Sequence, residues 1–226
     1  MRPRERRRTR FRLRLPAELD RRFEALVFDW DGTAVPDRRA DAATVRRLVE
    51  ALCHLGVDVA LVSGTHVGNV DGQLGARPPG PGALFLCLNR GSEVFRVGEP
   101  GPQLVHRRTA TPAEEAALSE AAALTTARLR GRGLTARIAS HRLNRRKIDL
   151  IPEEAWADPP KAAIPELLAA VEERLRRSGI DGLQEAAAVA RESALEAGLE
   201  NARVTSDAKH VEIGLTDKSD SARWIA

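Results

Sequence analysis

The chain has 226 residues, of which 42% are hydrophobic and 30% charged, and its formal net charge is +4. This length suits one large domain or a core with a substantial insertion, and the composition is that of a soluble globular protein. No apolar run approaches the roughly 18 residues that a membrane helix needs, so we expect no membrane partner. Cys53 and Cys87 lie among apolar residues without disulfide or zinc spacing, which is typical of reduced core cysteines in a cytoplasmic protein.

The first stretch of the chain, residues 1–20, is strongly basic. It lacks the apolar segment of a secretory signal. We interpret it as a basic tail that touches polyanions without sequence preference. Because no recognisable element for reading bases follows, we expect no specific nucleic-acid partner.

An apolar run ends abruptly in polar residues at 25–33, which read Ala-Leu-Val-Phe-Asp-Trp-Asp-Gly-Thr. The run predicts a buried central strand, and Asp29 and Asp31 then lie where open α/β sheets place their chemistry. Carboxylates at this spacing repel each other unless a cation or a division of labour separates their roles. A bound Mg²⁺ would supply both, with one carboxylate attacking phosphorus and the other handling the proton of the leaving group. Gly32 permits a tight turn, and the Thr33 hydroxyl can hold a loop group.

The segment Asp29-Trp-Asp31-Gly-Thr33 resembles the first motif of the haloacid dehalogenase-like phosphatases, which hydrolyse phosphate esters through an aspartyl phosphate. The resemblance implies that Asp29 is the nucleophile and a Mg²⁺ ligand. It also implies that Asp31 is the general acid/base, with its backbone carbonyl on the metal. The alternative interpretation is a strand that ends in a solvated, Asp-rich turn.

A helix and a second strand follow the first motif. Apolar residues between Val45 and Cys53 recur at helical spacing before Gly56, and residues 57–62 predict a buried strand. Strand, helix and strand in this order give a parallel pair, which carries Ser63 next to Asp29. Ser63 matches the phosphate-binding Ser or Thr of the second motif of the resembled family, and Gly64 would let backbone N–H groups approach the phosphate. A Ser-Gly turn or helix N-cap is the alternative.

Residues 83–88 predict a third core strand that leads into the turn Asn89-Arg90-Gly91. From there the pattern changes to short strands that alternate with helices, the first of which is opened by a capping box at 111–114. We expect an α/β fold with a Rossmann-like parallel sheet, incomplete at the C-terminus, and an inserted α/β cap. The expected parts are a basic tail (1–20), the first part of the core (21–92), the cap (93–215) and a return to the core (216–226).

Lys218 stands where large-cap members of the resembled family return to the core and supply their third motif, a lysine. A cation there would offset the charge of the nucleophile and the phosphoryl group. Lys147 is a weaker candidate for this role, and an ordinary exposed lysine at a helix start is the alternative for Lys218. Asp217 and Asp220 are nearby, but their context favours helix N-capping over metal binding.

The fourth motif of the resembled family, an acidic group after a further core strand, has no counterpart before Ala226. We therefore expect a truncated gene product, or a fragment whose remainder is encoded separately, with weak metal binding and inefficient turnover. We also expect the strand that carries Asp29 to form an exposed sheet edge, because the missing strand lies beside it in the resembled family.

The resemblance implies a Mg²⁺-dependent phosphatase acting on a small phosphorylated substrate, a sugar phosphate such as trehalose phosphate. One alternative is a phosphotransferase similar to phosphomannomutase, and another is a non-catalytic module that binds phosphosugars. Four polar residues of the cap are candidates for touching the substrate, although a solvated basic face would also explain them: Arg142, Asn144, Arg145 and Lys147.

Overall fold

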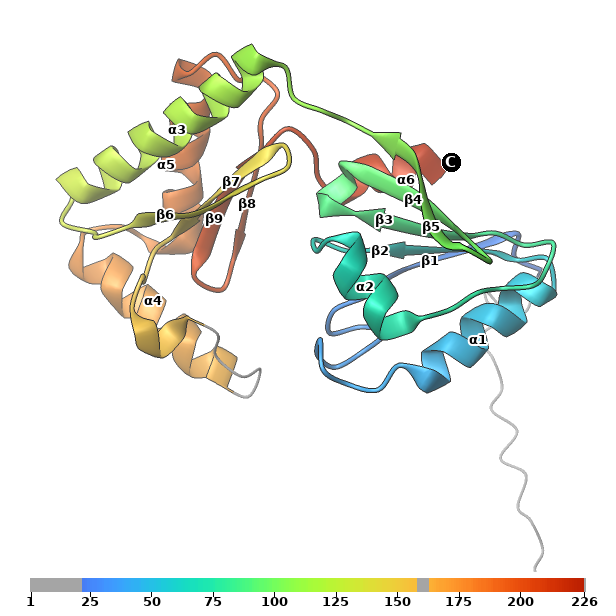
Figure 1. Cartoon of the computed structure of the whole chain (residues 1–226). Helices are drawn as coiled ribbons and strands as arrows, with labels where there is room; N and C mark the ends of the chain where they lie inside the picture. Colours follow the sequence, from blue (N-terminus) through green and yellow to red (C-terminus); the bar gives the residue numbers. More distant parts are fainter. Residues whose placement is uncertain (1–21, 158–162, 226) are drawn as a thin grey trace, which may run out of the picture.

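The computed structural model describes residues 22–157 and 163–225, so the basic tail at 1–20 lies outside the described residues. Its chain forms two sheets, each covered by helices (Figure 1). Within the described residues no helix is long and apolar enough to cross a membrane. The fold is thus of the expected α/β class, with two separate cores.

The first sheet has the strand order β1-β2-β3-β4-β5, in which β1 to β3 are parallel and β4 and β5 are antiparallel additions. Helices α1 and α2 cover one face around buried Trp30, Val49 and Leu74, and α6 lies on the other face (Figure 1). The bounds are β1 Ala25–Asp29, α1 Ala43–His54, β2 Asp58–Val62, α2 Val67–Leu74, β3 Leu84–Leu88, the 3₁₀ turn η2 Asn89–Gly91, β4 Glu93–Gly98, β5 Gly101–Arg107 and α6 Lys218–Ile225.

The second sheet is antiparallel, with the strand order β6-β7-β9-β8. Alternate residues of its strands, such as Ile148, Val211 and Ile213, pack with the helices in one apolar core, so the residues between them face away from the helices. Figure 1 shows the helices on the side turned away from the first sheet. The bounds are α3 Pro112–Gly131, β6 Arg137–Arg142, β7 Arg145–Asp149, η3 Glu154–Trp156, α4 Ile164–Arg177, α5 Gly182–Glu196, β8 Arg203–Asp207 and β9 His210–Gly214.

The start of the cap differs from the expected residue 93. Strands β4 and β5 pair with β3 in the first sheet, because the short η2 turn folds β4 straight back along β3, with Glu93 opposite Leu88. The second sheet and its helices begin only after Arg107. We therefore propose that the inserted cap spans residues 108–215.

One buried side chain joins the two chain segments that connect the sheets. Asn144, in the turn between β6 and β7, is fully buried and has a φ of 58°. Its amide nitrogen donates to the carbonyl oxygen of Arg108 at 2.6 Å and to the hydroxyl of Ser92 at 2.9 Å, and its amide oxygen accepts from the backbone N–H of Ala110 at 2.8 Å. Ser92 in turn bonds the hydroxyl of Thr216 at 2.7 Å. Both connections are thus tied at one place.

Candidate active site

Strands β1 and β2 bring the first two motifs together. Asp29 pairs with Val62 in the parallel register, so Ser63 follows β2 at the same sheet edge where Asp31 follows β1. The Ser63 hydroxyl donates to Asp31 Oδ2 at 3.1 Å and accepts from the backbone N–H of Thr65 at 3.2 Å. Only 1% of Ser63 is exposed, so this hydroxyl is held in one orientation by two partners.

The turn after β1 is shaped by its glycine and by a buried tryptophan. Gly32 has a φ of 85°, which an L side chain rarely adopts, and its N–H donates to the carbonyl of Val35 at 2.7 Å. The Trp30 ring is 1% exposed and donates its indole N–H to Gln73 at 2.9 Å. Trp30 anchors the turn in the core, so the side chains on either side of it, Asp29 and Asp31, remain at the surface of the sheet edge.

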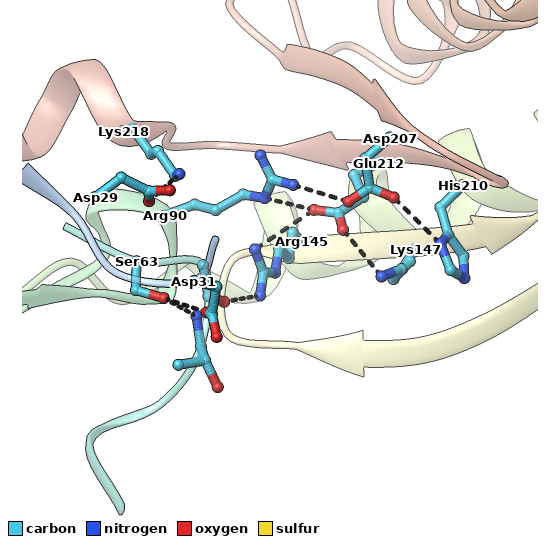
Figure 2. A network of polar contacts seen from close by, with 12 residues as sticks. Asp29, Asp31, Ser63, Arg90, Arg145, Lys147, Asp207, His210, Glu212 and Lys218 are labelled. Atoms are coloured by element: carbon cyan, nitrogen blue, oxygen red, sulfur yellow. Dashed lines mark hydrogen bonds and ion pairs between the residues drawn. The ribbon is translucent and has the colours of Figure 1, made fainter. Parts of the chain in front are cut away.

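Lys218 reaches the first motif from the far end of the sequence. Its Nζ lies 2.5 Å from Asp29 Oδ1, across a separation of 189 residues. The Thr33 hydroxyl donates to the other oxygen, Asp29 Oδ2, at 3.4 Å. Figure 2 shows Lys218 and Asp29 facing each other beside Ser63 and Asp31. Asp29, Asp31, Thr33, Ser63 and Lys218, the side chains singled out from the sequence, therefore converge on one site.

Helix α6 holds Lys218 through its own N-terminal turn. The backbone N–H of Asp217 donates to Asp220 Oδ2 at 2.8 Å, and that of Ser219 donates to Asp217 Oδ1 at 2.7 Å. Burial raises the pKa of Asp217, but hydrogen bonds from Ser219 and the charge of Arg203 outweigh it and lower the pKa below its ordinary value. Both carboxylates cap the helix as expected. Asp217 also lies 3.6 Å from Arg203, and Asp220 lies 3.0 Å from Arg223.

Gly64 lies against Arg145, one of the four cap candidates, and against Arg90, which sequence analysis did not place in the site. Its carbonyl oxygen accepts from Arg145 Nη2 at 2.6 Å. A Cβ on Gly64 would lie 3.6 Å from Arg90 Cγ and 3.9 Å from Arg145 Nη1, so even a methyl group would fill the remaining space. A third cation, Arg38, places its Nε 3.6 Å from Asp31 Oδ1.

A cluster of charges crosses from the first sheet to the second. Glu212 of β9, 4% exposed, lies 2.8 Å from Arg90 Nε, 3.4 Å from Arg145 Nη1 and 3.5 Å from Lys147 Nζ. Arg90 also approaches Asp207, 3.4 Å away. Figure 2 shows this cluster extending from the Asp29 and Ser63 region along the sheet of the cap. We call the set Arg90, Arg145, Lys147 and Glu212 the Glu212 cluster.

Burial alters two groups in and beside the Glu212 cluster. Desolvation lowers the pKa of Arg145 to about 10, although Glu212 partly opposes this, so the pair has little water around it. Burial raises the pKa of Asp207, but hydrogen bonding from His210 and the charges of Lys147 and Arg90 bring it below its ordinary value. Lys147 contacts Glu212, and the lysine that lies against Asp29 is Lys218.

Sequence reasoning missed Arg38, Arg90 and His210. The Arg90 backbone has a φ of 53°, and its N–H donates to the carbonyl of Ser63 at 3.2 Å, which turns the side chain towards the cap. The Asn-Arg-Gly turn after β3 is visible in the sequence. Nothing in this turn indicates that Arg90 would contact Glu212, which lies far along the chain. Arg142, the remaining cap candidate, is exposed, and Asn144 is a structural residue.

The oxygen ligands for a metal are few. Asp29 and Asp31 offer carboxylates at one sheet edge, and no group of three or more His, Cys, Asp or Glu side chains in the described ranges could hold a metal ion. Mg²⁺ keeps several waters and is often bound through one or two carboxylates. The residues present therefore fit a Mg²⁺ ion that is held mainly by Asp29, Asp31 and water.

Comparisons with known proteins give a likeness in structure only. No protein-family profile and no curated protein sequence matches the chain. The Plasmodium falciparum IMP-nucleotidase, truncated at its N-terminus, matches with a TM-score of 0.55 at 10% identity, over 88% of this chain and 55% of that one. Its IMP-bound form matches with a TM-score of 0.52 at 10% identity, over 90% and 55%.

A trehalose-6-phosphate phosphatase related protein also matches, with a lower TM-score of 0.41 at 15% identity, over 89% of this chain and 72% of that one. The chain spans about half of the length of the IMP-nucleotidase. At 10% identity this likeness shows the fold alone: an α/β chain with a mostly parallel first sheet and a second sheet, which is the fold class that the sequence predicted.

Proposed function

We propose that this chain carries the phosphoryl-transfer site of a phosphatase that hydrolyses phosphate monoesters. The observation that supports this most is the contact between Lys218 Nζ and Asp29 Oδ1, 2.5 Å apart, beside the buried hydroxyl of Ser63. A nucleophilic carboxylate, a cation on it and a hydroxyl donor are the groups that phosphoryl transfer through an aspartyl phosphate requires.

In the proposed reaction Asp29 attacks the phosphorus, and the bond between phosphorus and the ester oxygen breaks. Asp31 gives its proton to the departing oxygen and then takes a proton from the water that hydrolyses the aspartyl phosphate. Lys218 balances the charge of Asp29 and of the phosphoryl oxygens, and Ser63 hydrogen-bonds one of them. Asp29 and Asp31 would hold Mg²⁺, which when bound offsets the negative charge that gathers on the phosphoryl group.

The Glu212 cluster supports a polar substrate body. Lys147 and Glu212 lie on the face of the cap sheet that is turned away from its helices, and Arg145 links them to the backbone of Gly64. Donors and an acceptor side by side suit hydroxyl groups, which both donate and accept. We therefore infer a sugar phosphate, such as trehalose phosphate, as the substrate class. IMP, which is bound in a structure of the neighbour, is a second compound to test.

Phosphate release from a panel of sugar phosphates and IMP, with Mg²⁺ and with a chelator, tests the proposal. We expect release that needs Mg²⁺ and is lost in Asp29→Asn. Asp71→Asn is the matched control and should leave the activity unchanged, because Asp71 lies on α2 and pairs with Arg77, which follows that helix. Equal activity of Asp29→Asn and the unchanged chain would refute the aspartyl-phosphate route. Recovery of an isomeric sugar phosphate in place of free phosphate would favour the phosphomannomutase-like alternative.

A second candidate function is binding without turnover. It is favoured by the small number of carboxylates, since no group of three or more His, Cys, Asp or Glu side chains in the described residues could hold a metal ion. Titration calorimetry that detects a sugar phosphate while no phosphate is released would support a phosphosugar-binding module. In that case Lys218→Gln should weaken the binding of the sugar phosphate, and the change in affinity should be as large as the change that Asp29→Asn causes.

A further inference from the structure

Two arginines lie directly opposite each other in the cap sheet. Arg142 of β6 pairs with Arg145 of β7, and residues paired in this way point to the same face of a sheet. That face is turned towards the first sheet, because Arg145 donates to the carbonyl oxygen of Gly64 at 2.6 Å. Besides desolvation, the charges of Arg142 and Arg90 lower the pKa of Arg145. The two arginines therefore repel each other, and like charges in directly opposite positions destabilise a sheet.

The described residues leave donors of both arginines without an acceptor. The side chain of Arg142 is exposed and forms no hydrogen bond or ion pair with them. The Nε of Arg145 is buried and has no hydrogen-bond partner among them. Arg203 gives the contrast, because it lies in the same row of the sheet beyond Gly214 and has Asp217 3.6 Å away. A buried donor without an acceptor is costly, so an acceptor from outside the chain would stabilise this pair.

The charges around Arg145 do not balance. The Glu212 cluster and its neighbours Arg142 and Asp207 contain four cations and two carboxylates, and four minus two leaves an excess of two positive charges. The catalytic carboxylates do not offset this excess, because each has a cation of its own, Lys218 at Asp29 and Arg38 at Asp31. The phosphoryl group of a substrate carries about −1.5 to −2. The Mg²⁺ ion proposed for that site would offset it, so the excess at Arg145 is available to a different anionic group.

We propose that the substrate carries a second anionic group, a carboxylate or a further phosphate, and that Arg142 and Arg145 bind it. The inference rests on the proposed function, since the first anionic group is the phosphoryl group at Asp29 and Ser63. Guanidinium groups bind carboxylates and phosphates through paired N–H donors. Arg145 contacts the residue that follows Ser63, and consecutive Cα atoms lie about 3.8 Å apart. Both anionic groups can therefore belong to one monosaccharide.

Three compounds that differ only at the sixth carbon of glucose test the inference. Glucose 1-phosphate carries a hydroxyl group there, glucuronic acid 1-phosphate a carboxylate and glucose 1,6-bisphosphate a second phosphate. We expect kcat/KM for phosphate release to be at least about tenfold higher for a doubly anionic compound than for glucose 1-phosphate, because a hydrogen bond to a charged group contributes that much. The better of the two doubly anionic compounds shows which anionic group the arginines bind. Equal kcat/KM for all three compounds would overturn the proposal.

Arg142→Gln tests whether the arginine pair causes this preference. Arg142 is exposed, so the variant should fold. It should lower kcat/KM at least about tenfold more for the preferred doubly anionic compound than for glucose 1-phosphate. Arg176→Gln is the matched control and should leave the ratio of the two values unchanged, because Arg176 of α4 is 75% exposed and pairs with Glu173. An unchanged ratio in Arg142→Gln, with both values lowered equally or not at all, would contradict the proposal.

Binding measured without turnover separates a failure of this inference from a failure of the proposed function. Titration calorimetry in the presence of a chelator should give at least about tenfold tighter binding of the preferred doubly anionic compound than of glucose 1-phosphate, and Arg142→Gln should remove most of this difference. If binding follows this pattern while none of the compounds releases phosphate with Mg²⁺, the proposed hydrolysis is wrong and the second anion site stands. Equal affinities for all three compounds would overturn the second anion site, whatever the activity.

Discussion

Replacement of Glu212 by glutamine isolates the charge that holds the two sheets together. The glutamine keeps the size of the side chain and one acceptor oxygen, but it removes the negative charge that faces Arg90, Arg145 and Lys147 at 2.8 to 3.5 Å. Because Glu212 is 4% exposed, water cannot take its place. We therefore expect Glu212→Gln to destabilise the fold through three cations that lose their shared counter-charge.

The size of the effect follows from burial. Loss of one member of a buried ion pair costs about 3–5 kcal/mol, and the acceptor oxygen that glutamine retains places this variant near the lower end, at about 3 kcal/mol. In a chain of this length 1 kcal/mol shifts Tm by about 2–4 °C, so Tm should fall by about 6–12 °C. Sulfate should raise the Tm of Glu212→Gln more than that of the unchanged chain, because it supplies an anion to the cations.

The control is a glutamate whose ion pair is exposed. Glu196 pairs with Arg128, and its side chain is 54% exposed, so Glu196→Gln should cost less than about 1 kcal/mol. Thermal unfolding followed by circular dichroism compares the two variants at pH 7 and low salt. Equal shifts of Tm in Glu212→Gln and Glu196→Gln would refute the assignment of Glu212 as the buried counter-charge between the sheets.

Three further predictions concern the returning segment and the core. Lys218→Gln should lower kcat for phosphate release by about 10²–10³ with little change of KM, measured by steady-state kinetics, because its cation acts on developing charge. Gly91→Ala should lower the free energy of urea unfolding by about 2 kcal/mol or more, because Gly91 has a φ of 87° and a Cβ would lie 2.2 Å from the Asp217 carbonyl oxygen. Gly131→Ala should not lower it, because a Cβ on Gly131 would have nothing within 4 Å. Burial raises the pKa of Cys87 from 9.0 to about 12. Above pH 9.0 the Cys87 thiol of the unfolded chain loses a proton that the folded chain keeps. The contribution of Cys87 to the free energy of unfolding is therefore complete below pH 9.0 and should fall above it by about 1.4 kcal/mol per pH unit. Cys87→Ala should reduce the slope measured by urea unfolding between pH 9 and 11 by this amount, while Cys53, whose pKa burial raises to about 11, keeps its own share. An unchanged slope would contradict the assignment.

The sequence predicted the meeting of Asp29 and Ser63 because their placement follows from topology. Two parallel strands with a helical crossover must end at one sheet edge, whatever the details of packing. The position of Lys218 was an inference from resemblance, and no local pattern in the chain requires its contact with Asp29.

The sheet membership of β4 and β5 was not predicted. A period of two indicates a strand but does not name its neighbour. The signal that was overlooked is length, since only residues 89–92 separate β3 from β4, and a loop this short joins antiparallel neighbours. The charged contacts of the Glu212 cluster carry no comparable signal, because long-range pairs of arginine and glutamate leave no mark on local spacing.

Helix α5 was missed for a different reason. Its buried face consists mainly of small side chains, including Ala186, Ala187, Ala190 and Ala194, which do not stand out as an apolar stripe. Those small residues let α5 pack closely on α3, and Arg128 of α3 donates to Ser193 of α5 at 2.9 Å. Alanine favours helices strongly, so propensity was the better guide here than hydrophobic periodicity.

The amide of Asn144 bears on how the mouth of the site opens. The outgoing connection at Arg108 and Ala110 and the returning one at Thr216 are both held, directly or through Ser92, by this one turn of the cap. A cap that swung away from the core would have to break these buried bonds together, because neither connection can lengthen alone. A cap that opened to admit the proposed substrate would therefore have to release this joint as one unit.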